Sequence, residues 1–566
     1  MIYYVSAKQE SHSHFVYWCS AKKQISFISC NTSAPLPVTL TVHKLAVSKT
    51  NLADDTKMTF LYQDDQWLVV NKPSGISTHR AHEGDLGLVE FLDLHHDLKV
   101  RVCSRLDKGT NGVLIFGLTS DAVAKAQAIH EQDRAQKRYS FIAEKHQQSS
   151  WVCSDPLDGK PCKTHFQKIE EGTIYALYQA VIHRGRTHQI RRHAAASGIP
   201  LLGDSDYKGL KFSRLCLHCT TVEWPEISQI LASPLPLWFQ ACINGPLKRS
   251  AYHALIENRY PFLSSISDCC RLLHRGEYSM DMAVDKYGKW LCVTGFDETL
   301  SAQHLLDIHK EMLGTLCQVC NCQGGVVKTN LRAPHKRKLF ADIATWGKPI
   351  PDSFLVHEHE LHFNVQLNVK QHVGLFLDHR DSRRRIAKAA KAKRVANLFA
   401  FTCSFSVYAL AAGAEVVFSV DLAAGCLGQG RENIALNQLD GSGNAKFIKE
   451  DTRKWLARQG RKKQNEGPDY IPFDLIICDP PVFASSGKGK SFHVEKEWPD
   501  LVRNIHMILG KDGIALFSNN HQAGPEAFYF DTLKAVFQKV TRMKPPLDFP
   551  QVIGQPPHVR IYWCQK

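Results

Sequence analysis

The stretch Cys103-Ser104-Arg105-Leu106-Asp107-Lys108-Gly109-Thr110-Asn111-Gly112 runs directly into the apolar segment Val113-Leu114-Ile115-Phe116. A turn bounded by glycines and followed by a continuous apolar run predicts a buried strand that begins just after a loop. The loop carries one carboxylate, Asp107, between the cations Arg105 and Lys108, and these charges favour its ionised form. Taken alone, such a loop is typical of a charged surface turn, so its interpretation depends on the rest of the chain.

The composition indicates a large folded protein with several domains. The chain has 566 residues, 44% of them hydrophobic, and this length predicts roughly three or four domains. The 18 cysteines are scattered, no apolar segment is long enough to cross a membrane, and the first twenty residues lack the apolar core of a signal peptide. We therefore expect a cytoplasmic protein with reduced thiols. The net charge of +15 makes nucleic acid the first partner to consider.

Three further segments place aromatic and basic residues in short strands and loops. Residues 60–75 predict two strands joined by an Asp-rich turn. Residues 136–143 predict a strand that carries two cations and an aromatic ring. Residues 183–193 read His-Arg-Gly-Arg-Thr-His-Gln-Ile-Arg-Arg-His, which is dense in hydrogen-bond donors and contains no carboxylate to neutralise them.

Taken together, residues 58–225 resemble the catalytic domain of the RluA-type pseudouridine synthases. The matching blocks follow one another in the order Asn71-Lys72-Pro73-Ser74-Gly75, Arg105-Leu106-Asp107-Lys108-Gly109-Thr110-Asn111-Gly112, Lys137-Arg138-Tyr139, Gly185-Arg186-Thr187-His188-Gln189-Ile190-Arg191, Leu202-Gly203-Asp204 and Arg214-Leu215-Cys216-Leu217-His218. The chain departs from the family at Ser104, where the family has histidine, and at Asn111, where it has serine. The S4 RNA-binding domain often found in this family is not recognisable in residues 1–55.

The resemblance implies that the first site isomerises uridine without a cofactor. Isomerisation breaks the glycosidic bond, turns the uracil and joins its carbon 5 to the sugar, and one carboxylate can serve as nucleophile or base in these steps. By resemblance Asp107 is that carboxylate, and Arg191 pairs with it. Tyr139 would stack on the flipped uracil, and Arg105 would fill the position that the base leaves. From the residues alone, Tyr139 is also compatible with a core tyrosine and Arg105 with a phosphate contact.

From residue 357 onward, buried strands alternate with helices, which predicts a Rossmann-like sheet. Strands are expected at 394–399, 415–421, 447–451, 473–483 and 513–520. The second and third end in Asp421 and Asp451, at the edge where ligands bind in such sheets. An acid after the second strand can accept both ribose hydroxyls of a nucleoside, and one after the third can reach the adenine amino group. Since no Gly-x-Gly-x-x-Gly follows the first strand, S-adenosylmethionine fits better than a dinucleotide. Each acid alone is also compatible with a helix cap.

Residues 268–566 as a whole resemble the large-subunit rRNA methyltransferases of the RlmI/RlmK group. The matching blocks are Gly374-Leu375-Phe376-Leu377-Asp378-His379-Arg380, Asn397-Leu398-Phe399, Phe405-Ser406-Val407-Tyr408-Ala409, Arg431-Glu432-Asn433 and Asp479-Pro480-Pro481-Val482-Phe483. The resemblance implies that S-adenosylmethionine is bound by Asp378, Arg380, Asn397, Phe399, Thr402, Asp421, Asp451 and Asp479. It also implies that the substrate base contacts Pro480, Pro481 and Phe483. Phe483 is placed to stack on an extruded base, and its alternative is an ordinary core aromatic.

Guanine N7 is favoured as the methylated atom, with other atoms left open. Phe517-Ser518-Asn519-Asn520 and Ser485-Ser486-Gly487-Lys488 resemble the RlmK branch, which methylates guanine N7. That atom needs mainly positioning, whereas cytosine carbon 5 needs a cysteine thiolate that first adds to the ring. Cys478 is expected to face the core. Cys403, which stands in the cofactor loop where the family has glycine, keeps cytosine carbon 5 open, and guanine N2 is a further alternative. A side chain at position 403 is also expected to crowd the cofactor or to require an unusual backbone angle.

These inferences predict a multidomain protein of α+β and α/β class. Residues 1–55 form an N-terminal segment of unclear role, 56–245 a mixed-sheet pseudouridine synthase domain, 246–356 a linker and a small α+β RNA-binding-like domain, and 357–566 a Rossmann-like methyltransferase domain. Cys317-Gln318-Val319-Cys320-Asn321-Cys322 is expected to be a strand rather than a zinc site, because no second Cys or His pair follows. No metal is expected elsewhere either.

The sequence therefore predicts a bifunctional RNA-modifying enzyme. It would act on 23S rRNA or a ribosomal precursor, with S-adenosylmethionine as its only cofactor. The alternative is an RNA-binding or ribosome-assembly protein whose methyltransferase half is not catalytic.

Overall fold

The structure is a computed structural model, and it divides the chain into two compact units, Met1–Asp55 and Thr56–Lys566. It describes residues 3–9, 12–18, 40–43, 60–172, 174–210, 212, 214–236, 239, 242–243, 263–277, 280–332, 339–368, 372–441, 443–484, 491–550 and 557–566. In the first unit it describes an antiparallel sheet in the order β2-β1-β3. The strands are β1 (Tyr3–Gln9), β2 (His12–Trp18) and β3 (Leu40–His43).

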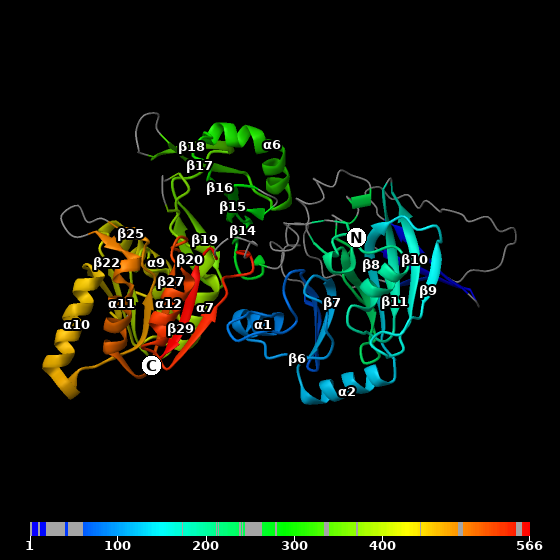
Figure 1. The fold of residues 1–566 in the computed structure, drawn as a ribbon, viewed down its shortest axis with the longest axis horizontal. Helices are drawn as coiled ribbons and strands as arrows, with labels where there is room; N and C mark the ends of the chain where they lie inside the picture. The colour runs from blue at the N-terminus through cyan, green and yellow to red at the C-terminus, as the bar shows by residue number, and fades with distance from the viewer. Residues whose placement is uncertain are drawn as a thin grey trace. The chain divides into compact units, whose positions relative to one another are not determined.

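A ten-stranded mixed sheet occupies residues 60–232 of the second unit (Figure 1). Its path is β4-β5-β7-β12-β8-β11-β10-β9, with β6 beside β7 and β13 beside β12. Only the pair of β7 and β12 is parallel among these described strands. The strands are β4 (Phe60–Gln63), β5 (Trp67–Lys72), β6 (Arg101–Val102), β7 (Asn111–Gly117), β8 (Gln136–Glu144), β9 (Ser150–Cys153), β10 (Thr164–Glu171), β11 (Tyr175–Ile182), β12 (Leu217–Glu223) and β13 (Leu231–Ala232). The helices are α1 (Leu88–His96), α2 (Ser120–Glu131), α3 (Gln189–Ala196) and the 3-10 turn η1 (Ser205–Tyr207).

The buried strand predicted after the charged loop is β7, in which every residue is buried. Its side chains alternate between the two faces of the sheet. Leu114 and Phe116 join one hydrophobic cluster, and Val113 and Ile115 join another that includes Ile129 of α2. Because both faces of β7 are packed, the end of the loop that precedes it is fixed in the middle of the sheet.

A second sheet, in the order β14-β15-β16-β17-β18, forms a small α+β region with helix α6 (Ala302–Val319). The strands are β14 (Cys269–Leu273), β15 (Met282–Tyr287), β16 (Trp290–Gly295), β17 (Gly324–Arg332) and β18 (Leu339–Gly347). The strand predicted over residues 317–322 is wrong, because the apolar face of α6 continues through Leu313 and Leu316 and carries the helix on to Val319. Within the described residues, no group of three His, Cys, Asp or Glu side chains could hold a metal ion.

The third large sheet confirms the predicted Rossmann-like fold. Its order is β23-β22-β21-β24-β27-β29-β28, parallel from β23 to β27 and antiparallel at β29 and β28. The strands are β21 (Arg394–Leu398), β22 (Val416–Asp421), β23 (Ala445–Lys449), β24 (Phe473–Cys478), β27 (Leu509–Asn519), β28 (Lys539–Met543) and β29 (Arg560–Gln565). Two short hairpins accompany the sheet, β19 (Phe354–Glu358) with β20 (Leu361–Val365), and β25 (Phe483–Ala484) with β26 (Phe492–His493). All five predicted strands are present.

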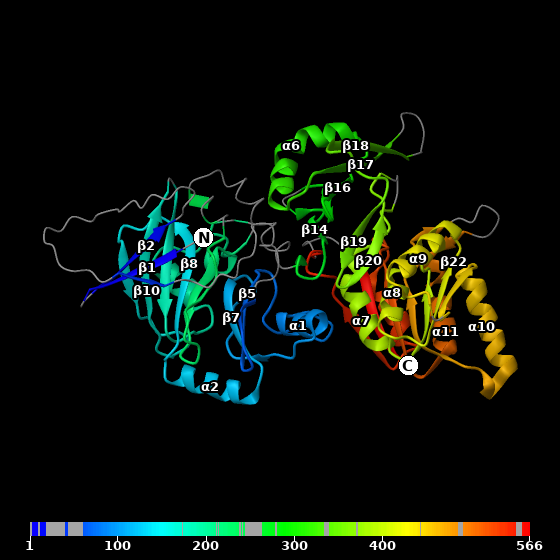
Figure 2. The same cartoon turned by 180° about the vertical axis from the view of Figure 1, so that it is seen from behind.

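Helices cover both faces of this sheet (Figure 2). Residues of α7 (Arg380–Ala390), α8 (Ser404–Ala411) and α9 (Ala424–Leu436) share one hydrophobic cluster with the sheet, and residues of α10 (Thr452–Glu466), α11 (Val494–Ile508) and α12 (Glu526–Lys534) share another. The remaining short turns are η3 (Leu377–His379) and η4 (Gly467–Asp469). This two-sided cover leaves the carboxyl ends of the parallel strands as the place for a ligand.

A buried ion cluster ties α7 to the first hairpin. The Glu358 carboxylate accepts hydrogen bonds at 2.7 and 2.8 Å from Arg383 and at 2.9 Å from the Tyr408 hydroxyl, and Arg380 lies 3.6 Å away. The side chains of Glu358, Arg380 and Arg383 have no exposed surface. Burial by itself raises the pKa of Glu358, but the two guanidinium groups outweigh burial and bring it down to about 2.

We expect Glu358→Gln to lower the free energy of unfolding by about 3–5 kcal/mol, because it leaves buried arginine charge uncompensated. Urea denaturation at pH 7 measures this, with exposed Glu360→Gln as the matched control. The pKa of Glu358 is lower in the folded state, so its contribution to stability is present above its ordinary value of 4.5 and is lost as the pH falls from there towards 2. A loss below about 1 kcal/mol would contradict the cluster's role.

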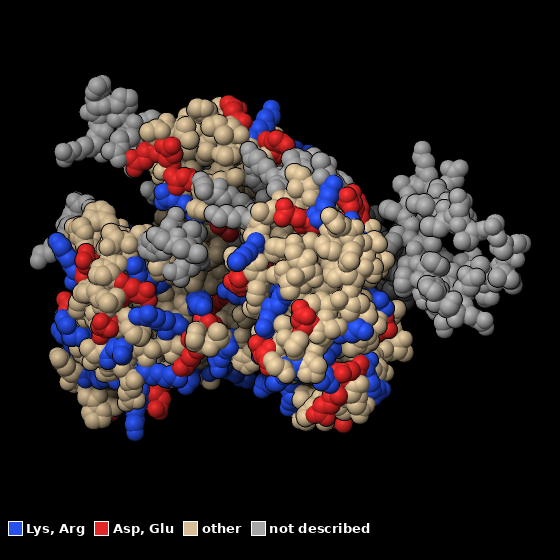
Figure 3. All heavy atoms as spheres, turned by 45° about the vertical axis from the view of Figure 1, so that its right-hand side comes forward, with Lys and Arg blue, Asp and Glu red and all other residues tan. Residues whose placement is uncertain are grey.

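Charge is not gathered into one patch on the face that Figure 3 draws. Lysine and arginine side chains are interspersed there with aspartate and glutamate. Of the helices that the structure describes, none combines the length and the apolarity that a bilayer crossing requires.

Candidate functional site

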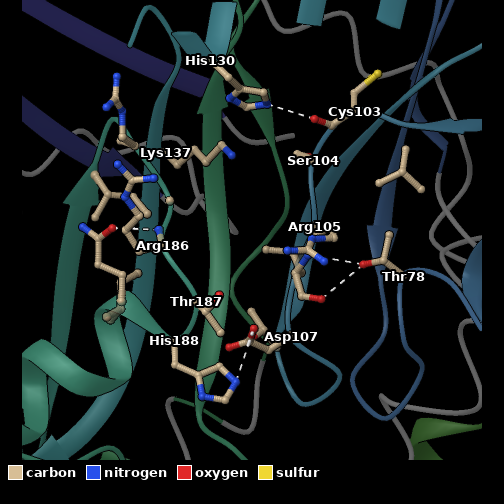
Figure 4. A pocket seen from close by; sticks show the side chains of 18 of the residues that line it. Thr78, Cys103, Ser104, Arg105, Asp107, His130, Lys137, Arg186, Thr187 and His188 are labelled. Carbon is tan, nitrogen blue, oxygen red and sulfur yellow. Dashed lines mark hydrogen bonds and ion pairs between the residues drawn. The ribbon is translucent and has the colours of Figure 1, made fainter. Parts of the chain in front are cut away.

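The loop that carries Asp107 opens into a cavity of about 1230 Å³ (Figure 4). The four residues predicted as catalytic, Arg105, Asp107, Tyr139 and Arg191, all line it. They come from the loop before β7, from β8 and from α3, so the fold brings together residues that are distant in the sequence. Arg105 is exposed, whereas Tyr139 is only 6% exposed.

Two nitrogen-bearing side chains, Arg191 and His188, face the Asp107 carboxylate. Arg191 Nη1 lies 3.8 Å from Asp107 Oδ2, and His188 Nε2 lies 3.8 Å from Asp107 Oδ1 (Figure 4 shows the latter pair). Arg191 has shorter contacts with two other acids, at 2.7 and 2.6 Å with Asp204 and at 2.7 Å with Asp206. The predicted pairing of Arg191 with Asp107 is therefore a longer ion pair, and Asp204 and Asp206 determine the orientation of the guanidinium.

Lys72 holds the backbone of the loop that carries Asp107. Its fully buried ammonium donates to the carbonyl oxygens of Pro73 at 3.0 Å, Asp107 at 3.1 Å and Thr110 at 2.6 Å. Burial lowers the pKa of Lys72 to about 7, although Asp107 opposes this shift. Thr78 adds a further anchor, because its hydroxyl contacts the backbone of Leu106.

Tyr139 has the environment of a group that stays neutral. Burial raises its pKa well above the ordinary value, and Cys219 and Asp107 act in the same direction. Its ring lines the cavity from β8. A protonated phenol with a ring at the cavity wall can stack on a base, and it is unsuited to take up a proton.

Sequence reasoning gave no role to three residues of this site, Lys72, His188 and Asp204. All three stand inside blocks that carry the family resemblance. Lys72 and His188 contact Asp107 from segments far apart in the chain, and Asp204 contacts Arg191 from the loop after α3. Nothing in the local pattern shows these contacts. The available signal was a lysine at the end of a strand whose preceding residues are mostly apolar and buried, as at Lys72 in β5.

A second cavity, of about 800 Å³, lies at the carboxyl ends of the parallel strands in the third sheet. Six of the eight residues predicted to bind the cofactor line it, namely Asp378, Asn397, Phe399, Asp421, Asp451 and Asp479. The predicted base-contacting residues Pro480, Pro481 and Phe483 line it as well, and Phe483 is 55% exposed. That exposure excludes the alternative of an ordinary core aromatic for Phe483.

The acids that end the second and third strands are held in different ways. Asp421 accepts hydrogen bonds from the backbone amides of Phe401 at 2.9 Å and Ala423 at 2.8 Å. Asp451 caps α10 through a 2.9 Å bond from the backbone amide of Arg453 and also pairs with that side chain. Both carboxylates thus face the cavity with part of their acceptor capacity already used.

Asp479 follows β24 and sits beside the base-contacting residues. Its Oδ1 accepts a 2.6 Å hydrogen bond from the Ser518 hydroxyl, and its Oδ2 lies 3.3 Å from His379 Nε2. His379 also lines the cavity and is 4% exposed. Burial lowers the pKa of His379, but Asp479 and Asp378 outweigh burial and raise it above the ordinary value.

The structure does not bring Arg380 and Thr402 to this cavity. Arg380 is completely buried and forms two hydrogen bonds, of 2.9 and 3.1 Å, with Asp548. Thr402 is buried and donates at 2.6 Å to the carbonyl oxygen of Gly374. Both residues anchor the backbone around the cavity. Ser485-Ser486-Gly487-Lys488 lies outside the described residues.

Cys403 adopts the backbone angle expected to be unusual, with φ of 61°, but its side chain does not crowd the cavity. It is fully buried in a cluster with Ala400 and Leu427 and packs towards Gly430 of α9. Burial raises the pKa of the Cys403 thiol to about 12 and raises that of Cys478 well above its ordinary value. Among the described residues that line the cavity there is no cysteine.

Comparison with known proteins agrees with this division of the chain. Residues 66–196 match the family described as RNA pseudouridylate synthase, and residues 285–558 match the family described as S-adenosylmethionine-dependent methyltransferase.

Two curated relatives carry the name ribosomal RNA large subunit methyltransferase K/L. The relative from Alteromonas mediterranea is 31% identical over 45% of this chain and 35% of its own length. The relative from Aeromonas salmonicida is 31% identical over 50% of this chain and 38% of its own length. The chain thus spans less than two fifths of the length of these relatives. A solved structure titled human RNA pseudouridylate synthase domain containing 1 is 24% identical, with a TM-score of 0.29, over 33% of this chain and 87% of that one.

The charged loop before β7 and the acid-ended strands of the third sheet therefore lie in domains of two different kinds. The chain combines an RNA pseudouridylate synthase domain with an S-adenosylmethionine-dependent methyltransferase domain.

Proposed function

We propose that this protein is a bifunctional RNA-modifying enzyme of cytoplasmic location. It isomerises a uridine to pseudouridine at the cavity around Asp107 and methylates a base at the cavity around Asp421 and Asp479. The observation that carries the proposal is the presence of two cavities that share no lining residue and that each hold the side chains their reaction needs. We propose 23S rRNA or its precursor as the substrate, because the curated relatives of the methyltransferase half are named for large-subunit ribosomal RNA.

The first reaction needs a carboxylate, a neutral stacking ring and a fixed positive charge. Asp107, Tyr139 and Arg191 supply these groups. Arg105, which is exposed at the same cavity, is free of the core and suited to enter the space that a flipped base vacates. No cofactor is required, since the reaction is an isomerisation.

The second reaction needs a site for S-adenosylmethionine and a second place for the acceptor base. Asp421 and Asp451 stand where the ribose hydroxyls and the adenine amino group are expected. Asp378, Asn397, Phe399 and Asp479 complete the cofactor-binding set that we propose. Phe483 with Pro480 and Pro481 forms the platform proposed for the base. S-adenosylmethionine supplies the methyl group.

Guanine N7 is the methylated atom that we propose. Methylation of cytosine carbon 5 requires a thiolate at the ring. Cys403 and Cys478 are buried, and burial raises the pKa of each thiol, so both thiols stay protonated. Guanine N7 carries its own lone pair and needs only orientation against the methyl group. Guanine N2 is the alternative product that analysis of the methylated nucleosides distinguishes.

The test uses the full chain, an unmodified 23S rRNA transcript and S-adenosylmethionine with a deuterated methyl group. The RNA is digested to nucleosides and analysed by chromatography with mass spectrometry. We expect pseudouridine and deuterated 7-methylguanosine. Methylcytidine or 2-methylguanosine in place of 7-methylguanosine would overturn the choice of atom. Methyl-free RNA together with no binding of S-adenosylmethionine in calorimetry would assign the second half a non-catalytic RNA-binding role.

A further inference from the structure

We propose that His188 is a second catalytic residue of the first site, the base that takes the proton from uracil carbon 5. This inference rests on the proposed isomerisation of uridine. It assigns a side chain to a step for which the predicted residues offer no separate group.

The reaction itself requires a proton carrier next to Asp107. When uridine becomes pseudouridine, the bond between N1 and the sugar carbon breaks, and a bond from uracil carbon 5 to the same sugar carbon forms. Carbon 5 must then lose its hydrogen, and N1 must gain one. In the route in which Asp107 attacks the sugar carbon, carbon 5 bonds to that same carbon and so carries its surplus hydrogen close to the carboxylate. A base for this step therefore has to border Asp107.

His188 occupies that place. Its Nε2 points at Asp107 Oδ1 across 3.8 Å, and the side chain lines the same cavity (Figure 4). The imidazole is 29% exposed, so it is open to the cavity. On its other side, Nδ1 lies 2.9 Å from the Tyr207 hydroxyl. When Nδ1 carries the hydrogen and donates a hydrogen bond to the Tyr207 hydroxyl, Nε2 has a free lone pair. This lone pair faces the space beside Asp107 and can accept a proton.

Tyr207 is itself held in place by the network around Arg191. The Arg191 guanidinium stacks 5.0 Å from the centre of the Tyr207 ring. Arg191 is in turn fixed by Asp204. The ring of His188 is thus oriented through Tyr207 by the same arginine that faces Asp107, which is the arrangement of a base whose geometry is maintained by supporting contacts.

Other titratable groups at the cavity fit this step less well. Within the described residues, only His188 and Arg191 place a side-chain nitrogen within 4.0 Å of the Asp107 carboxylate, each at 3.8 Å. Arg191 stays protonated at any relevant pH. Tyr139 has a raised pKa and stays a neutral phenol. His130 Nε2 lies 2.9 Å from the carbonyl oxygen of Cys103, so this nitrogen is already engaged.

The step balances without any further reactant. After carbon 5 has bonded to the sugar and Asp107 has left as a carboxylate, His188 Nε2 takes the hydrogen of carbon 5 as a proton. The electron pair of that bond restores the double bond between carbons 5 and 6, the second electron pair between carbon 6 and N1 returns to N1, and N1 takes a proton. His188 returns to its neutral form by giving its proton to N1 or to water.

The backbone at His188 makes a clean test available. Its φ is 54°, in the left-handed region that glycine and asparagine adopt readily, and the residue caps the start of α3. His188→Gly and His188→Asn therefore remove the imidazole without strain. Exposed His183, on the same segment, provides the matched control His183→Ala.

The experiment uses the full chain and a 23S rRNA transcript labelled with tritium at carbon 5 of uridine. Tritium released to water reports loss of the hydrogen from carbon 5, and RNA binding is measured in parallel. We expect His188→Gly and His188→Asn to slow release by about 10²–10⁴-fold, the range of general base catalysis, while binding RNA normally. Added imidazole should restore at least about tenfold of the rate of His188→Gly, whereas pyrazole, which has the same size and little basicity, should not. His183→Ala should match the unmodified protein.

Two results would overturn the proposal. If either variant at position 188 released tritium within about twofold of the unmodified protein, His188 would not be the base. If imidazole and pyrazole restored the rate equally, the side chain would only fill space. If the proposed function itself were wrong, the unmodified protein would release no tritium. This result differs from both of those above, in which the unmodified protein is active.

Discussion

Replacement of Asp107 by asparagine is expected to abolish pseudouridine formation, with a loss of at least about 10⁴-fold. Asparagine has nearly the same shape, so the loop before β7 keeps its anchors to Lys72, which bind the backbone carbonyls of residues 107 and 110 rather than the carboxylate. What disappears is the negative charge that the proposed reaction requires of residue 107, as nucleophile or as base. Arg191 and His188 lose the carboxylate they face, but Asp204 still holds Arg191.

Tritium release from the labelled transcript measures this effect, and thermal unfolding confirms that the variant folds. Asp121→Asn is the control, since Asp121 lies on α2, is 63% exposed and pairs with Lys125. Retention of more than about 1% of the activity by Asp107→Asn would show that the reaction does not depend on the Asp107 carboxylate. Methylation of the same transcript should be unchanged, because the two cavities share no residue.

Replacement of Asp421 by alanine is expected to weaken binding of S-adenosylmethionine by about 10²–10⁴-fold. Two hydrogen bonds from ribose hydroxyls to a carboxylate contribute about 1.5–3 kcal/mol each, so their loss corresponds to a change of this size in Kd. The substitution also releases the amides of Phe401 and Ala423, which the carboxylate holds at 2.9 and 2.8 Å. The amide of Phe401 belongs to the loop after β21 and that of Ala423 to the loop after β22, so the shape of the proposed cofactor site depends on the same group.

Calorimetric titration with S-adenosylmethionine measures the change, with exposed Asp440→Ala as the control. A Kd for Asp421→Ala within about threefold of the unmodified protein would place the ribose elsewhere in the cavity. Pseudouridine formation should be the same in both variants. A joint loss of both activities would instead indicate a folding defect, which thermal unfolding would reveal.

Local pattern was sufficient for much of the fold. The run from Val113 to Phe116 is continuous and apolar because both faces of β7 are covered, and a run of that kind is visible in any sequence. The acids Asp421 and Asp451 stand at strand ends because a parallel sheet collects its polar ligands at that edge. The zinc-like cysteines show the limit of local pattern. Alternation predicted a strand there, but the apolar face of α6 determined a helix up to Val319.

Roles within the two sites depended on contacts that no local pattern contains. Arg380 stands in a block expected to hold the cofactor, yet it pairs with Asp548, 168 positions away, and becomes part of the core. Cys403 was expected to crowd the cofactor, but its left-handed backbone turns the side chain towards Gly430. The direction of a side chain depends on backbone angles and on packing partners, and both are properties of the folded chain.

The sequence by itself determined that Asp107 precedes a buried strand and that a Rossmann-like sheet with acid-ended strands follows later in the chain. Burial and strand ends produce characteristic patterns of residue type, and these patterns can be read without the structure. Only the tertiary structure decided that Asp204 orients Arg191, that Lys72 holds the loop of Asp107, and that His188 faces its carboxylate. The contacts of Lys72 and His188 join segments separated by other strands, and that of Asp204 joins α3 to the loop that follows it. Their geometry exists only once the sheet has brought those segments together.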